Sequence, residues 1–557
     1  MKPTLLLTFF LTFTIAFSQT DQFNSKIESI SQSLQKVQTS KTEYIQKIAT
    51  DEPGVVKLQI DEVTLKNGKT ESFLYEFNLA DIDVNTVRAI TLKDVISVQL
   101  LANKKQNLIK RTINGEKISY EREFNLYATD IDNGRVLEKL FQEAIPIAEA
   151  ITNARLDLKG YADHLQWLTD NVGDVNLPGK QFVQSIAAVE PYPGKVELKK
   201  IENAGKKTIS EGYVFNAGTI NPNSLMFSIK GDEFGVSMET SRKIDNIKYY
   251  RDNQQGNYTN ELRIVFENIE KARDFQKVMK EFITLSHEKF EKTLPTTSSV
   301  SAGFQTLNGL VAQITVNDAT TTQEFTGNCV ATLTQRYVDA KKSTIKEYVF
   351  NFKDANENNI PYRSKGQDLF VTVGINGGND YIKFTEEGEQ KNFTEEFDLY
   401  VPGVEEALIT IQVLKDVIKL CQQEKEPFDG VSKSGKLAKL TENLEKVSIN
   451  DQTFDQTFEI SEDGKSIIYK KIEISPKSSV EYIYEFNLKD IDPNSVKIET
   501  SRKNVRTVAN TYFQEKIIKS YKDGNIGNYE NRLEIEANDI ENARKLKILL
   551  SGVAGKD

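Results

Sequence analysis

Apolar residues recur along this chain with two different periods. In four stretches they stand at positions i, i+3, i+7 and i+10, a spacing that places them on one face of an amphipathic helix. These stretches are residues 27–37, 165–175, 304–314 and 437–447. Burying four such side chains would contribute roughly 6–12 kcal/mol of gross stabilisation per stretch. We therefore expect each helix to pack against its own domain.

A second helical pattern lies further along the chain in each case, at residues 130–141, 267–279, 401–414 and 538–550. Asn268 and Asp539 are natural N-caps for two of these helices, because their side-chain oxygens can accept free backbone N–H groups. Between the two helices, alternating or β-branched runs predict antiparallel strands. Hairpin turns are expected at pairs that favour positive φ, namely Asn67-Gly68, Asn114-Gly115, Asp463-Gly464 and Asp523-Gly524.

One strand-and-turn motif occurs four times. YEFNLADIDVNTV at 75–87 returns as YEFNLKDIDPNSV at 484–496, with weaker relatives at 213–225 and 348–360. Its phenylalanines are 138, 135 and 136 residues apart, at Phe77, Phe215, Phe350 and Phe486. A fixed period of this size indicates tandem domains rather than a solenoid of small units.

These patterns predict an α+β protein of four tandem repeats. Each repeat is expected to be an antiparallel β-sheet or partly closed barrel flanked by an N-terminal and a C-terminal helix. The expected boundaries are 19–158, 159–293, 301–428 and 429–557. Residues 294–300, rich in Pro, Thr and Ser without apolar periodicity, are expected to be a linker between two halves.

The DID segment of the motif allows two interpretations. Asp81, Asp83 and Asn85 have the D-x-D-x-N spacing that begins an EF-hand calcium loop. The sixth position is Thr86 instead of Gly and the twelfth is Leu92 instead of Glu, so the match stops there. Short carbonyl side chains at this spacing also turn the chain by bonding to nearby backbone N–H groups. We favour the turn and predict no metal or other cofactor.

A small basic patch is the one ligand site that the sequence suggests. Repeats 2 and 4 share ETSRK, at 239–243 and 499–503. The patch would comprise Ser241, Arg242, Lys243, Ser501, Arg502 and Lys503, and it could hold an anionic ligand. The alternative is an ordinary solvated strand face among acidic neighbours.

The N-terminus predicts export. Lys2 precedes an apolar run at 5–17, and Ala16 and Ser18 form a small-x-small cleavage site, so residues 1–18 are expected to be a signal peptide. The mature protein would begin at Gln19 and lie in the periplasm or outside the cell. This apolar run is short for a membrane span and no second one follows, so a signal anchor is the weaker interpretation and we predict no membrane span.

The net charge limits the possible partners, and the number of cysteines limits the possible disulfides. The formal net charge of −10 is dispersed along the chain, which argues against nucleic-acid binding because phosphate contacts need clustered Lys and Arg. The two cysteines, Cys329 and Cys421, fall in the same repeat. In an exported protein they could form a disulfide, or they could be two small buried thiols.

No local pattern indicates catalysis. His164 and His287 lie in different repeats, without His or Cys partners at zinc-ligand spacing, and neither a nucleophile elbow nor a P-loop motif occurs. The leading prediction is a secreted, non-catalytic repeat protein that binds a partner protein, an envelope component or a small ligand. Two alternatives stay open. One is a periplasmic hydrolase with a carboxylate-based site between domains, and the other is a structural spacer.

Overall fold

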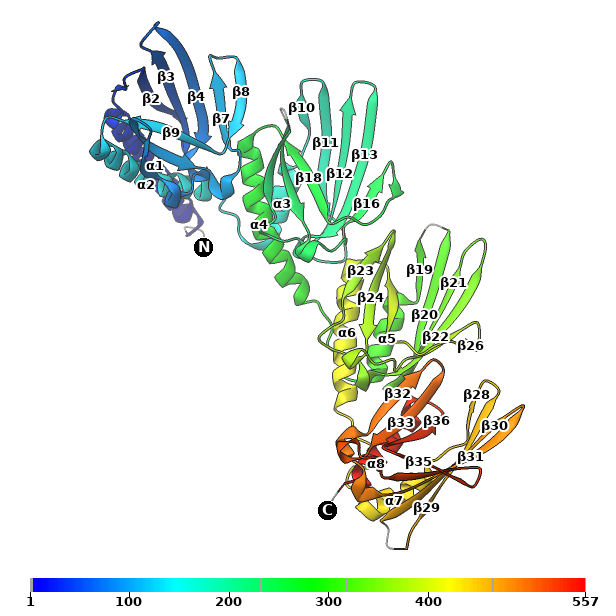
Figure 1. Cartoon of the computed structure of the whole chain (residues 1–557). Coiled ribbons are helices and arrows are strands. Elements are labelled where there is room, and N and C mark those ends of the chain that lie inside the picture. The colour runs from blue at the N-terminus through cyan, green and yellow to red at the C-terminus, as the bar shows by residue number, and fades with distance from the viewer. Residues whose placement is uncertain (1–3, 231–232, 317, 463–464, 556–557) are drawn as a thin grey trace. The chain divides into compact units, whose positions relative to one another are not determined.

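The chain is an α+β protein in which α-helices accompany antiparallel β-sheets (Figure 1). The computed structural model describes residues 4–230, 233–316, 318–462 and 465–555, without the side chains of residues 4–18. The chain divides into two compact units, Met1–Thr293 and Leu294–Asp557. Each unit contains two modules, which we number 1 to 4 in chain order.

Module 1 begins with α1 (Thr4–Ser33) and ends with α2 (Ile131–Arg155). Its larger sheet has the strand order β1-β2-β3-β4-β7-β8, from Val37–Gln38, Thr42–Glu52, Val55–Thr64, Lys69–Asn78, Ile109–Ile113 and Lys117–Glu121. Its smaller sheet has the order β5-β6-β9, from Arg88–Leu92, Val95–Leu101 and Glu123–Ala128.

Module 2 repeats this order between α3 (Gly160–Asn171) and α4 (Ile269–Glu291). The six-stranded sheet is β10-β11-β12-β13-β16-β17, from Val175–Leu177, Lys180–Ala188, Lys195–Ala204, Lys207–Asn216, Lys248–Arg251 and Gln254–Gln255. The three-stranded sheet is β14-β15-β18, from Met226–Lys230, Glu233–Glu239 and Glu261–Phe266.

Module 3 lies between α5 (Val300–Val311) and α6 (Val404–Gln422). The larger sheet is β19-β20-β21-β22-β25-β26, from Gln313–Val316, Ala319–Gly327, Val330–Val338, Ser343–Asn351, Lys383–Glu386 and Glu389–Gln390. The smaller sheet is β23-β24-β27, from Tyr362–Lys365, Asp368–Gly374 and Glu396–Val401.

Module 4 lies between α7 (Lys433–Glu442) and α8 (Ile540–Val553). The larger sheet is β28-β29-β30-β31-β34-β35, from Val447–Ile449, Gln452–Ile460, Ser466–Ser475, Ser478–Asn487, Ile518–Lys522 and Asn525–Glu530. The smaller sheet is β32-β33-β36, from Lys497–Ser501, Asn504–Asn510 and Arg532–Ala537.

The alternative of a partly closed barrel is wrong. In every module the chain leaves the larger sheet after its fourth strand, forms the first two strands of the smaller sheet, and then returns to pair with that fourth strand. In module 1, for example, β4 pairs directly with β7. This excursion separates the strands into two open sheets instead of closing one sheet on itself.

A buried glutamine bridges the two sheets of each module. In module 2 the Nε2 of Gln184 donates to the carbonyl of Val265 at 2.8 Å, and its Oε1 accepts the Val265 N–H at 3.0 Å. The same double contact joins equivalent residues elsewhere, in the pairs Gln46–Tyr127, Gln323–Tyr400 and Gln456–Glu536. Since buried backbone groups need hydrogen-bond partners, this amide satisfies one strand and fixes its distance from the other sheet.

The motif phenylalanines all enter cores of the same design. Each is the next-to-last residue of the fourth strand of its larger sheet, and all four are buried: Phe77, Phe215, Phe350 and Phe486. The equivalent rings of Phe77 and Phe350 both pack on an aromatic of the smaller sheet, with centroids 4.8 and 4.7 Å apart.

The DID segment forms two consecutive 3-10 turns, η1 (Leu79–Asp81) and η2 (Val84–Thr86). Asn78 accepts the Ala80 N–H at 2.9 Å, and Asp83 accepts the Asn85 N–H at 3.0 Å. The predicted turn chemistry is confirmed by these two caps. Asn268 and Asp539 are also confirmed as N-caps of α4 and α8.

The expected hairpin pairs occupy connections of different length. Asp523-Gly524 is a two-residue connection in which both residues have positive φ. Asn67-Gly68 and Asn114-Gly115 lie in the longer connections β3–β4 and β7–β8. Asp463-Gly464 lies outside the described residues.

Candidate binding grooves at the module junctions

A buried ion pair joins the two modules of the first unit. Asp81, at the end of η1 in module 1, is 5 % exposed, and Arg273, on α4 of module 2, is 2 % exposed. The Nε of Arg273 donates to Oδ1 of Asp81 at 2.5 Å and its Nη2 donates to Oδ2. The remaining Nη1 donates to Glu270, one turn earlier on α4. The planar guanidinium is therefore held by two carboxylates in fixed orientation.

Burial and charge act in opposite directions on this pair. Burial raises the pKa of Asp81, and the Arg273 charge opposes that rise. Burial alone would lower the pKa of Arg273, but Asp81 and Glu270 reverse this effect and raise it. The guanidinium therefore stays charged inside the junction, where loss of either partner would leave an uncompensated buried group.

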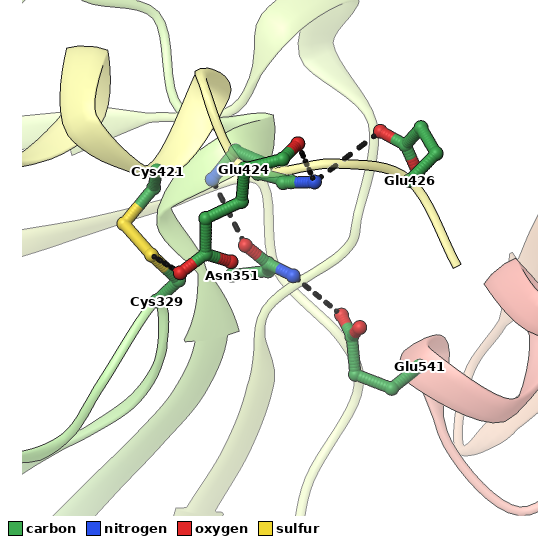
Figure 2. Close-up of a disulfide and its surroundings, with 7 residues drawn as sticks. Cys329, Asn351, Cys421, Glu424, Glu426 and Glu541 are labelled. Atoms are coloured by element: carbon green, nitrogen blue, oxygen red, sulfur yellow. Dashed lines mark hydrogen bonds and ion pairs between the residues drawn. A yellow bond between two sulfur atoms is a disulfide. The ribbon is translucent and has the colours of Figure 1, made fainter. Parts of the chain in front are cut away.

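The second unit uses equivalent residues at its own junction. Arg544 on α8 donates to Asp354, which ends the 3-10 turn η6 (Phe352–Asp354), and to Glu541 at 3.3 Å. The motif asparagine also takes part, because Asn351 donates from Nδ2 to Glu541 at 3.0 Å (Figure 2). In the first unit the corresponding contact joins Asn78 and Glu270 at 3.4 Å. We call this arrangement of Asn, Asp, Glu and Arg the junction lock.

Sequence reasoning did not find the junction lock. It assigned the motif Asp to a turn. It assigned residues 267–279 and 538–550 to helices with N-caps, without a contact to another repeat. The available signal was that Glu and Arg occur three residues apart in both helix starts, at Glu270/Arg273 and Glu541/Arg544. That signal does not reveal which repeat the arginine contacts.

Each junction contains a groove beside its lock. In the first unit the groove has a volume of about 410 Å³ and is lined in part by Val55, Phe77, Leu108, Lys110, Ile269 and Glu270. In the second unit a groove of about 130 Å³ is lined by the equivalent residues Val330, Phe350, Tyr381, Lys383, Ile540 and Glu541. Both grooves thus share apolar lining residues, one lysine and one glutamate.

The larger groove carries additional charge. Glu52 and Glu76 line it together with Glu270, and Lys110 forms an ion pair with Glu76 at 2.7 Å. In the smaller groove Val349 occupies the position of Glu76. Only one of the three carboxylates is therefore common to both grooves. One side of the larger groove is aromatic, where Tyr120 packs edge-on against Phe234 with ring centroids 5.2 Å apart.

Module 3 has a separate polar pocket of about 190 Å³. It opens at Thr321, two residues before the bridging Gln323. The equivalent positions in the other modules are aromatic: Tyr44, Phe182 and Phe454. Lys342, Lys346 and Glu386 line the pocket with Tyr400. The other three modules thus have an aromatic side chain at a position that lines this pocket in module 3.

The two SRK triplets do not occupy equivalent positions. Ser241, Arg242 and Lys243 form the 3-10 turn η5 after β15, where Lys243 pairs with Glu239 at 3.3 Å. Ser501 instead ends β32, and Arg502 and Lys503 make the hairpin turn to β33. The ETSRK segments of repeats 2 and 4 therefore do not correspond to each other in the fold, and the binding of an anionic ligand by either triplet stays a prediction.

The second triplet lies at the junction of modules 3 and 4. The Arg502 carbonyl accepts the Phe393 N–H at 3.0 Å, and the Lys503 carbonyl accepts from Gln390 at 3.3 Å. The Lys503 ammonium pairs with Glu389 at 3.5 Å. The backbone of the second triplet and the ammonium of Lys503 thus both contact module 3.

The cysteines and one histidine have structural contacts. Cys329, just before β21, and Cys421, at the end of α6, are joined by a disulfide of 2.11 Å with Cα atoms 5.5 Å apart (Figure 2). His164 contacts the Gly160 carbonyl at 2.7 Å and Glu281 at 3.0 Å, which connects α3 to α4. Within the described residues no group of three or more His, Cys, Asp or Glu side chains is placed to hold a metal ion.

Comparison with models of known protein families gives no match, and no curated protein sequence matches the chain. Across the described part of the chain, every helix is too short or too polar to cross a bilayer.

Proposed function

We propose that this chain is an exported, non-catalytic binding protein that holds a partner protein or an envelope polymer in its junction grooves. The observation that carries this proposal is the recurrence of one groove, built from equivalent residues, in both compact units. A structural spacer would not need the same recess twice.

The sizes of the grooves favour a macromolecular partner. Pockets for small organic ligands usually measure about 300–1,000 Å³, a range that includes the groove of about 410 Å³ and excludes that of about 130 Å³. A single side chain or sugar unit of a longer partner is the kind of group that both grooves could accept. The shared lysine and glutamate would orient a polar group on that partner.

The junction lock supports the same proposal. Since it fastens module 1 to module 2 and module 3 to module 4, each groove has fixed walls before a partner arrives. Pre-organisation of this kind reduces the entropic cost of binding. We also infer that each module is a repeat flanked by its own two helices, which pack on each other as α1 with α2 and α3 with α4.

Capture experiments with groove variants test the proposal. Val55 and Val330 occupy equivalent positions in the two grooves, so Val55→Arg and Val330→Arg should block them. The matched control is Val338→Arg, because Val338 is exposed at the other end of the same strand as Val330. We expect the unmodified chain and the control to retain the same partner from envelope extract, and the double groove variant to lose it. Equal capture by all three chains would contradict the proposal.

A hydrolase is the second candidate, because Glu52, Glu76 and Glu270 all line the larger groove. Two carboxylates across a cleft are sufficient for glycoside hydrolysis. Release of soluble fragments from envelope polymers, abolished by Glu52→Gln, would favour this candidate. The absence of two of these carboxylates from the smaller groove favours binding.

Export is part of the proposal and has its own test. The apolar run at 5–17 and the cleavage site before Gln19 support it. N-terminal sequencing of the protein recovered from outside the cytoplasm should begin at Gln19. Recovery of the uncleaved chain from the cytoplasm would contradict it.

A further inference from the structure

The two ends of the chain carry the two unused halves of a junction lock. Asp490 in module 4 occupies the position of Asp81 and Asp354, at the end of the 3-10 turn η8 (Leu488–Asp490). It is partly exposed, and among the described residues it has no ion-pair partner. One half of a lock is thus free at the C-terminal module.

The other half is free at the N-terminal module. Arg135 on α2 occupies the position of Arg273 and Arg544, four residues after the first residue of its helix. Its side chain is 70 % exposed and pairs with Asp132 at 3.3 Å, three residues earlier. The acid-to-arginine spacing on the helix is therefore the same as in both closed locks.

Module 4 also exposes large apolar side chains. Phe513, Ile517 and Tyr529 of module 4 are 93, 41 and 54 % exposed. The residues equivalent to Ile517 and Tyr529 in modules 1 and 3 contact the next module or line its groove: Leu108, Tyr120, Tyr381 and Phe393. The face that modules 1 and 3 bury against a following module is therefore uncovered in module 4.

The free arginine also has an exposed apolar neighbour. Ile131 begins α2 and is 42 % exposed. Its equivalents are Ile269, which packs against the core of module 1, and Ile540, which is buried and lines the second groove. Module 1 thus presents the same side chains that modules 2 and 4 insert into a junction.

Modules 2 and 3 each lack one of these two residues at the corresponding position. Module 2 has Thr219 at the position of the aspartate, and module 3 has Leu408 at the position of the arginine. Among the residues that the structure describes, complementary free halves therefore occur only in modules 1 and 4.

We propose that module 4 of one chain docks on module 1 of a second copy through a third junction lock, with Asp490 bound by Arg135. The contact is heterologous, because two different surfaces meet, so it adds chains head to tail and produces either closed rings or open filaments. This inference rests on the junction geometry and is independent of the proposed binding of another partner.

Complementary single variants test the proposal. We expect the purified full chain to form a concentration-dependent series of oligomers in sedimentation velocity between about 1 and 100 μM. Arg135→Glu and Asp490→Arg should each raise the apparent dissociation constant by at least about 30-fold, because each places like charges in the lock. Lys47→Glu and Asp451→Arg make matched charge reversals at exposed positions and should leave association unchanged.

Mixing two single variants whose altered surfaces repel each other distinguishes head-to-tail docking from any symmetric dimer. Asp490→Arg does not serve here, because its positive charge would pair with the negative charge introduced by Arg135→Glu, so the tail is blocked by Ile517→Glu at an exposed apolar position. The Arg135→Glu chain keeps a functional tail, because Asp490 is intact, and the Ile517→Glu chain keeps a functional head, because Arg135 is intact. Their mixture should therefore form a one-to-one dimer that does not grow further. A monomeric wild-type chain throughout the range, association insensitive to Arg135→Glu, or a mixture without dimers would each overturn the proposal.

Discussion

Gln184 contacts both sheets of module 2 at once, and its role illustrates how single polar residues organise this fold. Its amide takes both the N–H and the carbonyl of Val265, and the same amide stands at the same place in the other three modules. Each strand that carries it alternates buried and exposed residues. A buried polar residue in such a strand is meaningful because its burial requires partners.

Replacing this amide should destabilise its unit. Gln184→Leu keeps the side-chain volume but leaves the Val265 N–H and carbonyl without partners, so we expect a loss of about 2–4 kcal/mol in the free energy of unfolding. The matched control Ser185→Ala, at an exposed position on the same strand, should change it by no more than about 0.5 kcal/mol. Denaturant unfolding measures both, and equal effects would contradict the bridging role.

The motif tyrosines predict a loss of stability in alkali. Burial raises the pKa of Tyr348 and of Tyr484 to about 12, from an ordinary value of 10.0. Between these values the unfolded chain loses the phenolic protons while the folded chain keeps them, so the second unit should become less stable as pH rises. Unfolding measured from pH 9 to 12 should show this slope, and it should diminish in the variant Tyr348→Phe/Tyr484→Phe. An unchanged slope in that variant would assign the effect to other groups.

At the scale of elements, the starts of α4 and α8 do more than begin helices. Each supplies an N-cap, an apolar residue, a glutamate and an arginine within its first turns, and the last three act on the preceding module. Periodicity predicts the helix and its cap because both depend on local chemistry. The docking partner depends on residues some 190 positions away, which no local pattern specifies.

The junction lock should show strong coupling between its members. Arg273→Met alone leaves Asp81 buried without a counter-charge, so we expect a loss of about 3–5 kcal/mol. Adding Asp81→Leu removes that buried charge and should restore part of the stability, which a double-mutant cycle measures.

The chain contains its own control for this cycle. Arg135→Met alters the equivalent arginine, which pairs with the exposed Asp132 of its own helix instead of a buried aspartate, so in dilute solution it should cost no more than about 0.5 kcal/mol. The lock would be contradicted if the double variant lost the sum of the two single losses in unfolding free energy. It would also be contradicted if the variants at Arg135 and Arg273 lost equal amounts.

At the scale of the whole molecule, the sequence predicts the α+β class and the recurrence of strands and turns. It does so because each repeat has the same alternation of apolar and polar residues and the same capping residues. It does not predict that each repeat divides its strands between two sheets, since that depends on which strand β4 pairs with after the excursion. The grooves were not predictable either, because Val55 and Ile269 meet only through packing of two modules.

Removing the disulfide should affect one unit only. Cys329 and Cys421 are 92 positions apart in the sequence, and in the chain-entropy model a loop of this length contributes about 4–5 kcal/mol. In scanning calorimetry, Cys329→Ala/Cys421→Ala should lower the transition of the second unit and leave that of the first unit in place. Equal shifts in both transitions would show that the two units do not unfold separately.

The same disulfide has a mechanical consequence. If tension were applied to the two ends of the chain, the residues between Cys329 and Cys421 could not be drawn out even after module 3 had lost its fold. This separation of 92 positions corresponds to roughly 300–330 Å of extended polypeptide. Module 3 would therefore yield little length under load, whereas the three modules without cysteine could each extend fully.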